Sequence, residues 1–165
     1  MTKESKPAVR PIHPQRIDLA TLILSVADAY AETFDLCRIE LDLDVPHNLW
    51  VDVDSVLMKE AFRKLIDNAI EAMPSGGMLT ITSLIGRHGL EVEFADSGCG
   101  ISDELKERLF EPYATTKHDH AGLGLVMVKD IVESHNGSVE VDDCPQGGTA
   151  FTLQIPVRKS YRQVA

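Results

Sequence analysis

The chain has 165 residues, of which 44% are apolar, and it carries a formal net charge of −10. This length fits one compact domain, and the acidic balance argues against a nucleic-acid or anionic-membrane partner. No apolar run approaches the ~20 residues that a bilayer-spanning helix needs. We therefore expect a soluble chain without direct membrane contact.

The three cysteines are widely spaced and form no CxxC pair: Cys37, Cys99 and Cys144. An odd number without close pairs argues against a disulfide framework and against a zinc site. We expect a reducing compartment, the cytoplasm, and three small buried side chains.

Three prolines predict an extended or disordered leader over residues 1–16, because each fixes φ and removes a backbone donor. From Asp18 to about Phe34, apolar residues recur at helical spacing, and Asp18 is placed to cap that helix. Residues 38–44 then alternate strictly between apolar and charged, which predicts a strand. The same two-residue period returns at 79–81, 90–94, 139–141 and 151–155.

Two further helices are expected, from about Asp54 to Met73 and from about Leu123 to His135, and a short one after Ser102. Each strand has one polar and one apolar face, as in a sheet covered on one side only. The predicted fold is therefore α+β, a two-layer α/β sandwich with a mixed sheet of about five strands and three main helices on one face. We expect one domain over residues 17–158, followed by a tail at 159–165.

The helix from Asp54 to Met73 carries a polar stripe beside its apolar one. Glu60, Lys64 and Asn68 recur at four-residue steps, and Glu71 lies three residues further on. An ordinary surface ion pair between Glu60 and Lys64 explains two of these residues. Polar groups bordering a buried face otherwise need partners, so a binding role for the stripe stays open.

The segment Asp96-Ser-Gly-Cys-Gly100 directly follows a predicted strand. A carboxylate at a strand end, with glycines after it, suits a loop whose backbone approaches a flat ligand closely. A carboxylate oxygen accepts from the exocyclic amino group of adenine, whereas guanine presents a carbonyl there. The same residues are also compatible with a plain turn.

Gly122-Leu-Gly-Leu125 opens the last predicted helix. Glycines there let phosphate oxygens reach free N–H groups where the helix dipole favours negative charge. Neither a P-loop nor a GxGxxG pattern is present. The polar segment before it, residues 113–121, is suited to a lid over a ligand, and Lys117 is the obvious cation for a terminal phosphate.

The order of these motifs resembles the boxes of histidine-kinase catalytic domains, within the superfamily of type II topoisomerases, heat-shock chaperone ATPases and mismatch-repair ATPases. The match runs through Asn68, Asp96-Gly98-Gly100, Phe110-Glu-Pro, Gly122-Gly124 and Gly147-Gly148-Thr149, over about residues 16–157. The phrases DNAIEAMPSGG, LFEPYATTK and GLGL look most like the nitrogen-regulation type of sensor kinase.

This resemblance implies a Bergerat-type fold that binds Mg-ATP, in the cytoplasm or in the cytoplasmic part of a membrane-anchored sensor. It implies that Asn68 binds Mg²⁺, that Asp96 holds the adenine amino group and that Thr149 supports Asp96. Lys117 would meet the γ-phosphate, and Phe110 would pack at the hinge of the lid. The other nucleotide-binding residues implied are Glu71, Ala72, Gly98, Gly100, Ile101, Gly122, Leu123, Gly124 and Leu125.

Two positions depart from the family pattern: Lys64 stands where these kinases usually have Asn, and Glu71 where many have Lys. A charged lysine cannot be a general base for water, which argues against an ATPase clamp; Lys64 could instead contact a phosphate. No histidine has the phosphoacceptor context, so the acceptor is expected on a separate domain, with a response regulator as an indirect partner. The alternatives are an anti-sigma-factor serine kinase and a docking module with a degenerate site.

Overall fold

A computed structural model describes residues 11–87, 89–112 and 123–156. Its largest element is a five-stranded sheet in the order β2-β4-β5-β7-β6, in which β2 and β4 are parallel and all other neighbours are antiparallel. This confirms the predicted mixed sheet. The strands are β2 (Ile39–Asp44), β4 (Gly77–Ile85), β5 (Leu90–Asp96), β6 (Ser138–Asp143) and β7 (Thr149–Ile155).

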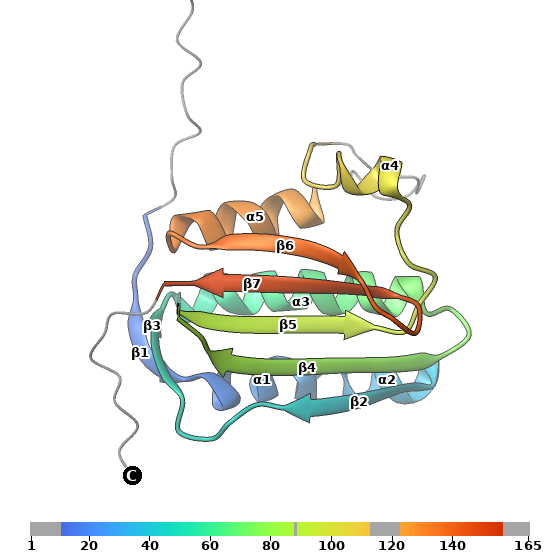
Figure 1. The fold of residues 1–165 in the computed structure, drawn as a ribbon. Coiled ribbons are helices and arrows are strands. Elements are labelled where there is room, and N and C mark those ends of the chain that lie inside the picture. The colour runs from blue at the N-terminus through green and yellow to red at the C-terminus, as the bar shows by residue number, and fades with distance from the viewer. Residues whose placement is uncertain (1–10, 88, 113–122, 157–165) are drawn as a thin grey trace, which may run out of the picture.

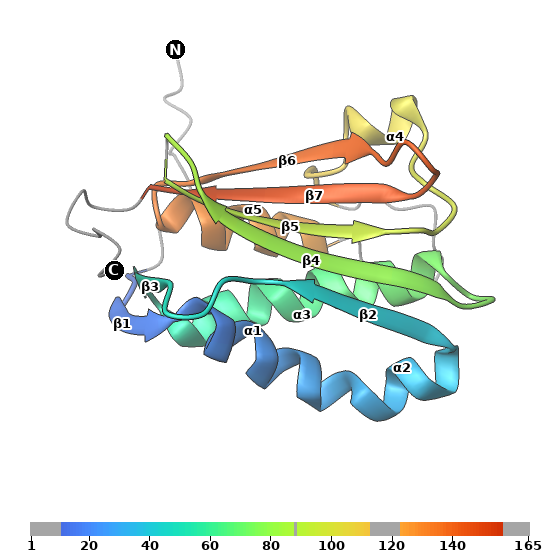
Figure 2. The ribbon, with the colours of Figure 1, turned by 60° about the horizontal axis from the view of Figure 1, so that its bottom comes forward.

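The long helices cover one face of this sheet and leave the other face open (Figures 1 and 2). Between the two layers lies the apolar core, where Phe62 and Phe94 meet with ring centroids 5.3 Å apart. The two-layer sandwich is therefore as expected from the one-sided strands. The covering helices are α1 (Leu19–Ala27), α2 (Ala31–Cys37), α3 (Ser55–Ala72) and α5 (Gly124–Ser134).

The first helix is shorter than its apolar spacing predicted. Asp18 caps α1 as expected, accepting from the backbone N–H of Thr21, but a 3-10 turn, η1 (Asp28–Tyr30), separates α1 from α2. Tyr30, the last residue of that turn, has φ −103° and ψ 0°. Its hydroxyl donates to the Asp67 carboxylate of α3 at 2.7 Å, which fixes this turn against the neighbouring helix.

A second, two-stranded sheet was not predicted. Strand β1 (Gln15–Asp18) pairs antiparallel with β3 (Trp50–Val53). Val51 and Val53 are buried and alternate with exposed residues, so the period of two was present, but over only four residues.

Within the described ranges, no helix combines the length and the apolar character needed to cross a bilayer.

The ends of several elements converge at one edge of the sandwich (Figure 1). Strand β5 ends there at Asp96, β7 begins there at Thr149, and α3 finishes beside them at Ala72. The first turn of α5 and the short helix α4 (Asp103–Lys106) lie toward the same side. Most of the motifs singled out in the sequence are thereby gathered at this edge.

Candidate functional site

Asp96, the last residue of β5, is buried, with 6% of its surface exposed. Its Oδ1 accepts hydrogen bonds from the N–H of Gly98 at 2.8 Å and of Thr149 at 3.3 Å. Burial raises the pKa of this carboxyl, and the two N–H donors act in the opposite direction. Among the described residues nothing donates to Oδ2, so this side chain is oriented with one oxygen left for another donor.

The loop after Asp96 lies directly against the last turn of α3. The N–H of Cys99 donates to the carbonyl oxygen of Ala72 at 3.1 Å. A Cβ at Gly98 would come within 2.5 Å of that same oxygen and 2.7 Å of the Ala72 Cβ. Gly98 therefore has no room for a side chain, while Gly100 has φ +75°, which a glycine adopts without strain.

Thr149 forms the opposite wall of the Asp96 site. It is only 2% exposed, and its N–H reaches Asp96 across 53 residues of sequence. Gly148 before it has φ +94°, and a Cβ there would collide with the Asp96 carbonyl oxygen. From the sequence, Gly148 was recognised only as part of a motif. The left-handed conformation of Gly148 and the collision that a Cβ would cause there show that it has a packing role.

Asn68 lies on α3, one turn before Ala72. Its Nδ2 is buried and makes no hydrogen bond within the described structure. A buried amide nitrogen without a partner is unfavourable by about 1–3 kcal/mol, so the residue is suited to meeting a ligand. Glu71, also on α3, is exposed.

Lys64, one turn before Asn68, lies beside the first residue of α5. A Cβ at Gly124 would be 3.7 Å from its Cδ. The ion pair between Lys64 and Glu60 that the sequence allowed is absent from the described residues. The side chains of Leu123 and Leu125 are exposed and half-buried respectively. Lys117 and Gly122, two of the expected phosphate contacts, lie outside the described residues.

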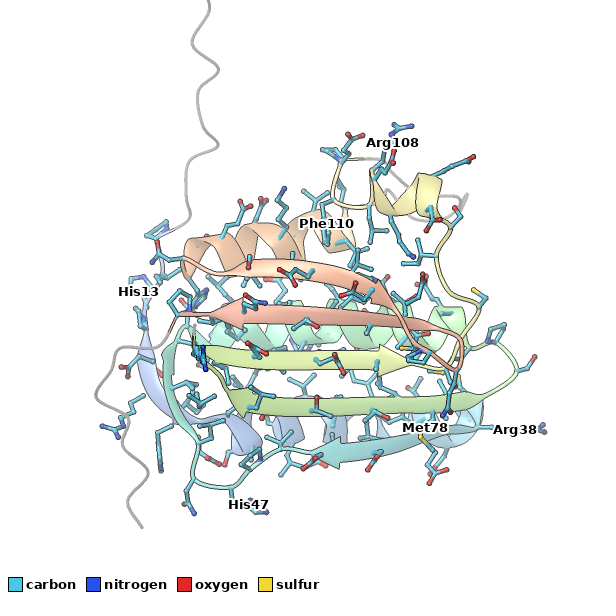
Figure 3. The ribbon with its side chains drawn as sticks, in the orientation of Figure 1. His13, Arg38, His47, Met78, Arg108 and Phe110 are labelled. Atoms are coloured by element: carbon cyan, nitrogen blue, oxygen red, sulfur yellow. The ribbon has the colours of Figure 1, made fainter. Side chains whose placement is uncertain are left out.

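Ile101 and Phe110 are half-buried and pack against the apolar core. The ammonium of Lys129 on α5 lies 6.0 Å from the centre of the Phe110 ring, and Figure 3 places Phe110 by the first turns of that helix. Lys106 of α4 pairs with Asp143 of β6 at 2.6 Å. The sequence missed both lysines, since no local pattern relates them to partners so far along the chain.

The three cysteines are free, but their expected burial was wrong. Cys99 is exposed in the loop after Asp96, and Cys37 and Cys144 are half-buried. The Cys99 N–H is bonded to the carbonyl oxygen of Ala72, and Gly98 beside it packs closely on Ala72, so the backbone of this loop occupies the side that faces α3.

The described site thus combines an oriented carboxylate at a strand end, closely packed glycine loops and a cation next to a helix start. Residues 53–159 match the family model of histidine kinase-, DNA gyrase B- and HSP90-like ATPases. The catalytic domain of histidine kinase ThkA has a similar structure, with a TM-score of 0.82 and 30% identity over 88% of this chain and 97% of that one.

Two curated relatives are similar in sequence. Sporulation kinase A of Bacillus subtilis is 38% identical over 109 residues, 66% of this chain. Sensor histidine kinase ZraS of Escherichia coli O157:H7 is 33% identical over 152 residues, 90% of this chain. The chain spans 18% of the first protein and 33% of the second. It belongs to the family of histidine kinase-, DNA gyrase B- and HSP90-like ATPases, as an ATP-binding catalytic domain of the sensor histidine kinases.

Proposed function

We propose that this chain binds Mg-ATP at the sheet edge and presents its γ-phosphate to a histidine of a separate phosphoacceptor domain. A response regulator is then the indirect partner in two-component signalling. The observation that carries the proposal is the geometry of Asp96, whose Oδ1 is anchored by two N–H groups while Oδ2 has no donor among the described residues. This carboxylate would accept from the amino group of adenine.

The role of the chain in the reaction is positioning. Phosphoryl transfer passes through a loose transition state, so orientation and neutralisation of charge contribute most of the rate. Gly98 and Gly100 would shape the purine pocket, and residues 122–125 would bind phosphates at the start of α5. Lys117 would neutralise the γ-phosphate. The attacking imidazole comes from the acceptor domain.

The residues near Asn68 fit a magnesium ion that is shared with the nucleotide. Mg²⁺ takes oxygen ligands and commonly binds through substrate phosphates and one or two protein groups. No cluster of three His, Cys, Asp or Glu side chains suited to a metal occurs within the described residues. The side-chain oxygen of Asn68 would be the protein ligand, its buried Nδ2, which has no partner among the described residues, would donate to a phosphate oxygen, and the ion would neutralise phosphate charge.

The motifs around Phe110 and Gly124 also support assignment to the nitrogen-regulation type of sensor kinase. The replacement of the usual Asn by Lys64 argues against an ATP-driven clamp, since lysine is no general base for water. Steady hydrolysis of ATP by the isolated chain, measured as phosphate release, would contradict the argument against a clamp.

Equilibrium titration with ATP and GTP, with and without Mg²⁺, tests the proposal. We expect ATP to bind more tightly than GTP. Asp96→Asn preserves the shape but replaces an acceptor oxygen with an NH₂ donor, which would face the amino group of adenine. We therefore expect a roughly tenfold to hundredfold loss of ATP affinity, equivalent to ~1–3 kcal/mol. Asp103→Asn, on exposed α4, is the matched control and should leave affinity unchanged. Equal ATP affinity in the wild type and Asp96→Asn would contradict the adenine contact.

A further inference from the structure

Lys64 stands out among the basic residues of α3 because of what lies next to it. Its side chain is half-buried, and its Cδ is 3.7 Å from the position of a Cβ on Gly124, the first residue of α5. A side-chain atom at residue 124 would make ordinary van der Waals contact with the aliphatic part of this lysine. The aliphatic part of the Lys64 side chain thus lies beside the N-terminal turn of α5.

This lysine has no acidic partner within the described part of the chain. The chain contains 26 acidic residues against 16 lysines and arginines, so an unpaired cation is not explained by a shortage of carboxylates. Glu60, one helical turn earlier, is spaced for an i,i+4 pair and does not form one. A half-buried cation without a counter-ion is suited to a ligand that brings negative charge.

The helix start beside Lys64 favours the same kind of ligand. Helix α5 has eleven residues, and Leu123 at its N-cap makes no side-chain capping hydrogen bond. Amide groups of a first helical turn and the helix dipole attract anions. One turn further along α3, the buried Nδ2 of Asn68 also lacks a partner. Two groups that can bind an anion therefore meet at this junction, and a third, Asn68, lies one turn away on α3.

The spacing along α3 distinguishes the phosphate end of the site from its purine end. Ala72 touches the Gly98 loop next to Asp96, and Lys64 precedes Ala72 by eight residues, or about 12 Å along the helix axis at 1.5 Å per residue. A ligand whose base lies at Asp96 and whose tail runs along α3 would bring its phosphates to Lys64.

We propose that Lys64 binds the phosphate tail of the nucleotide together with the N-terminus of α5. This role rests on the proposed function and extends it, because an ammonium on α3 would add a phosphate contact to those expected from residues 122–125 and Lys117. It also accounts for how a chain of net charge −10 holds a polyanion: a lysine without an acidic partner among the described residues lies beside a helix start, where the helix dipole also favours negative charge.

The test compares ligands that differ only in phosphate number. Binding of ATP, ADP and adenosine is titrated to the wild type, Lys64→Met, Lys64→Arg and Lys59→Met. Lys59→Met removes the same charge from the same helix but at a position turned by about 140°. We expect Lys64→Met to lower the affinity for ATP and for ADP about tenfold and to leave the affinity for adenosine unchanged. Lys64→Arg and Lys59→Met should stay within about twofold of the wild type for all three ligands.

Four outcomes would overturn the role of Lys64. Unchanged ATP affinity in Lys64→Met, or an equal loss for adenosine and ATP, would exclude a phosphate contact while leaving the proposed function intact. An equal loss in Lys59→Met would attribute the effect to net charge alone. If the wild type bound neither ATP nor adenosine, the proposed function itself would fail, and the role of Lys64 with it.

Discussion

Gly147 and Gly148 precede β7 with nearly the same backbone conformation but very different surroundings. Their φ values are +97° and +94°. A Cβ on Gly147 would meet nothing within 4 Å, whereas one on Gly148 would collide with the carbonyl oxygen of Asp96. Glycine is therefore needed at residue 147 for conformation alone, and at residue 148 for both conformation and space.

Alanine at each position separates these two requirements. Gly147→Ala should lower the free energy of unfolding by about 1–2 kcal/mol, the penalty of a left-handed non-glycine residue. Gly148→Ala should lower the free energy of unfolding by more. It should also weaken ATP binding, because it displaces the end of β5, which carries the Asp96 carboxylate. Urea denaturation and ATP titration measure the two effects. Equal losses of stability, with ATP affinity intact in both, would contradict the packing role of Gly148.

At the scale of elements, Asp54 joins three parts of the fold. Its Oδ1 caps α3 by accepting from the N–H of Val56 and of Leu57, both at 3.1 Å. Its Oδ2 accepts from the N–H of His13 at 2.9 Å, and its own N–H donates to Nε2 of His135, at the end of α5, at 3.0 Å. Figure 3 shows His13 at the end of the sandwich away from Phe110.

The hydrogen bond from His13, followed by those from Leu57 and Val56, lowers the pKa of Asp54 below its ordinary value of 3.8, against the opposing effect of burial. A depressed folded-state pKa means that the ionised group contributes stability above the unfolded value, and that this contribution is lost as pH falls through the folded value.

Asp54→Ala should therefore destabilise the protein by about 1–2 kcal/mol at neutral pH, the upper range for a helix cap. The difference from the wild type should shrink once pH drops below 3.8. Urea unfolding across that range measures both. Asp18→Ala, which removes the cap of α1, is the control for loss of a cap that does not connect three elements. A penalty for Asp54→Ala that does not change with pH would contradict the role of its charge.

The elements that could be predicted from sequence are those with a sustained local period. Helix α3 has 18 residues bounded by Asp54 and Met73, and β2 alternates over six residues. Strands β1 and β3 have four residues each, too few for one alternation to be distinguished from a loop. The break at Tyr30 depends on its bond to Asp67, 37 residues away, and no local pattern contains it.

The candidate site also contains parts that local sequence predicts and parts that it does not. The glycine loop after Asp96 and the glycines before α5 were readable as motifs because their function depends on local backbone. The bond from Thr149 to Asp96 and the placement of Lys64 against Gly124 join residues far apart in sequence. Only the resemblance implied the first of these contacts, and only the packing of α3 against α5 revealed the second.

At the scale of the whole molecule, the candidate site draws on elements from across the chain. Asn68 and Ala72 come from α3, Asp96 from β5, Thr149 from β7 and Gly124 from α5. The ends of α3 and β5 and the start of β7 meet at one edge of the sandwich, and α5 begins toward the same side (Figure 1). An unfolded chain cannot assemble such a site. A nucleotide that binds here must therefore bind the folded state alone and stabilise it by mass action.

At a concentration of 100 times its dissociation constant, ATP should raise the free energy of unfolding by about 2.7 kcal/mol. Thermal or urea denaturation with added ATP, adenosine and GTP measures this. We expect the order ATP, then adenosine, then GTP at equal concentration, because adenosine lacks the phosphate contacts and guanine opposes an acceptor at Asp96 with its own carbonyl. Asp96→Asn should reduce the shift to about 0.4–1.4 kcal/mol at the same ATP concentration, given its tenfold to hundredfold loss of affinity. A shift of equal size for ATP and GTP would mean that the phosphates alone hold the ligand, and that the buried carboxylate at the end of β5 serves only to orient its own loop.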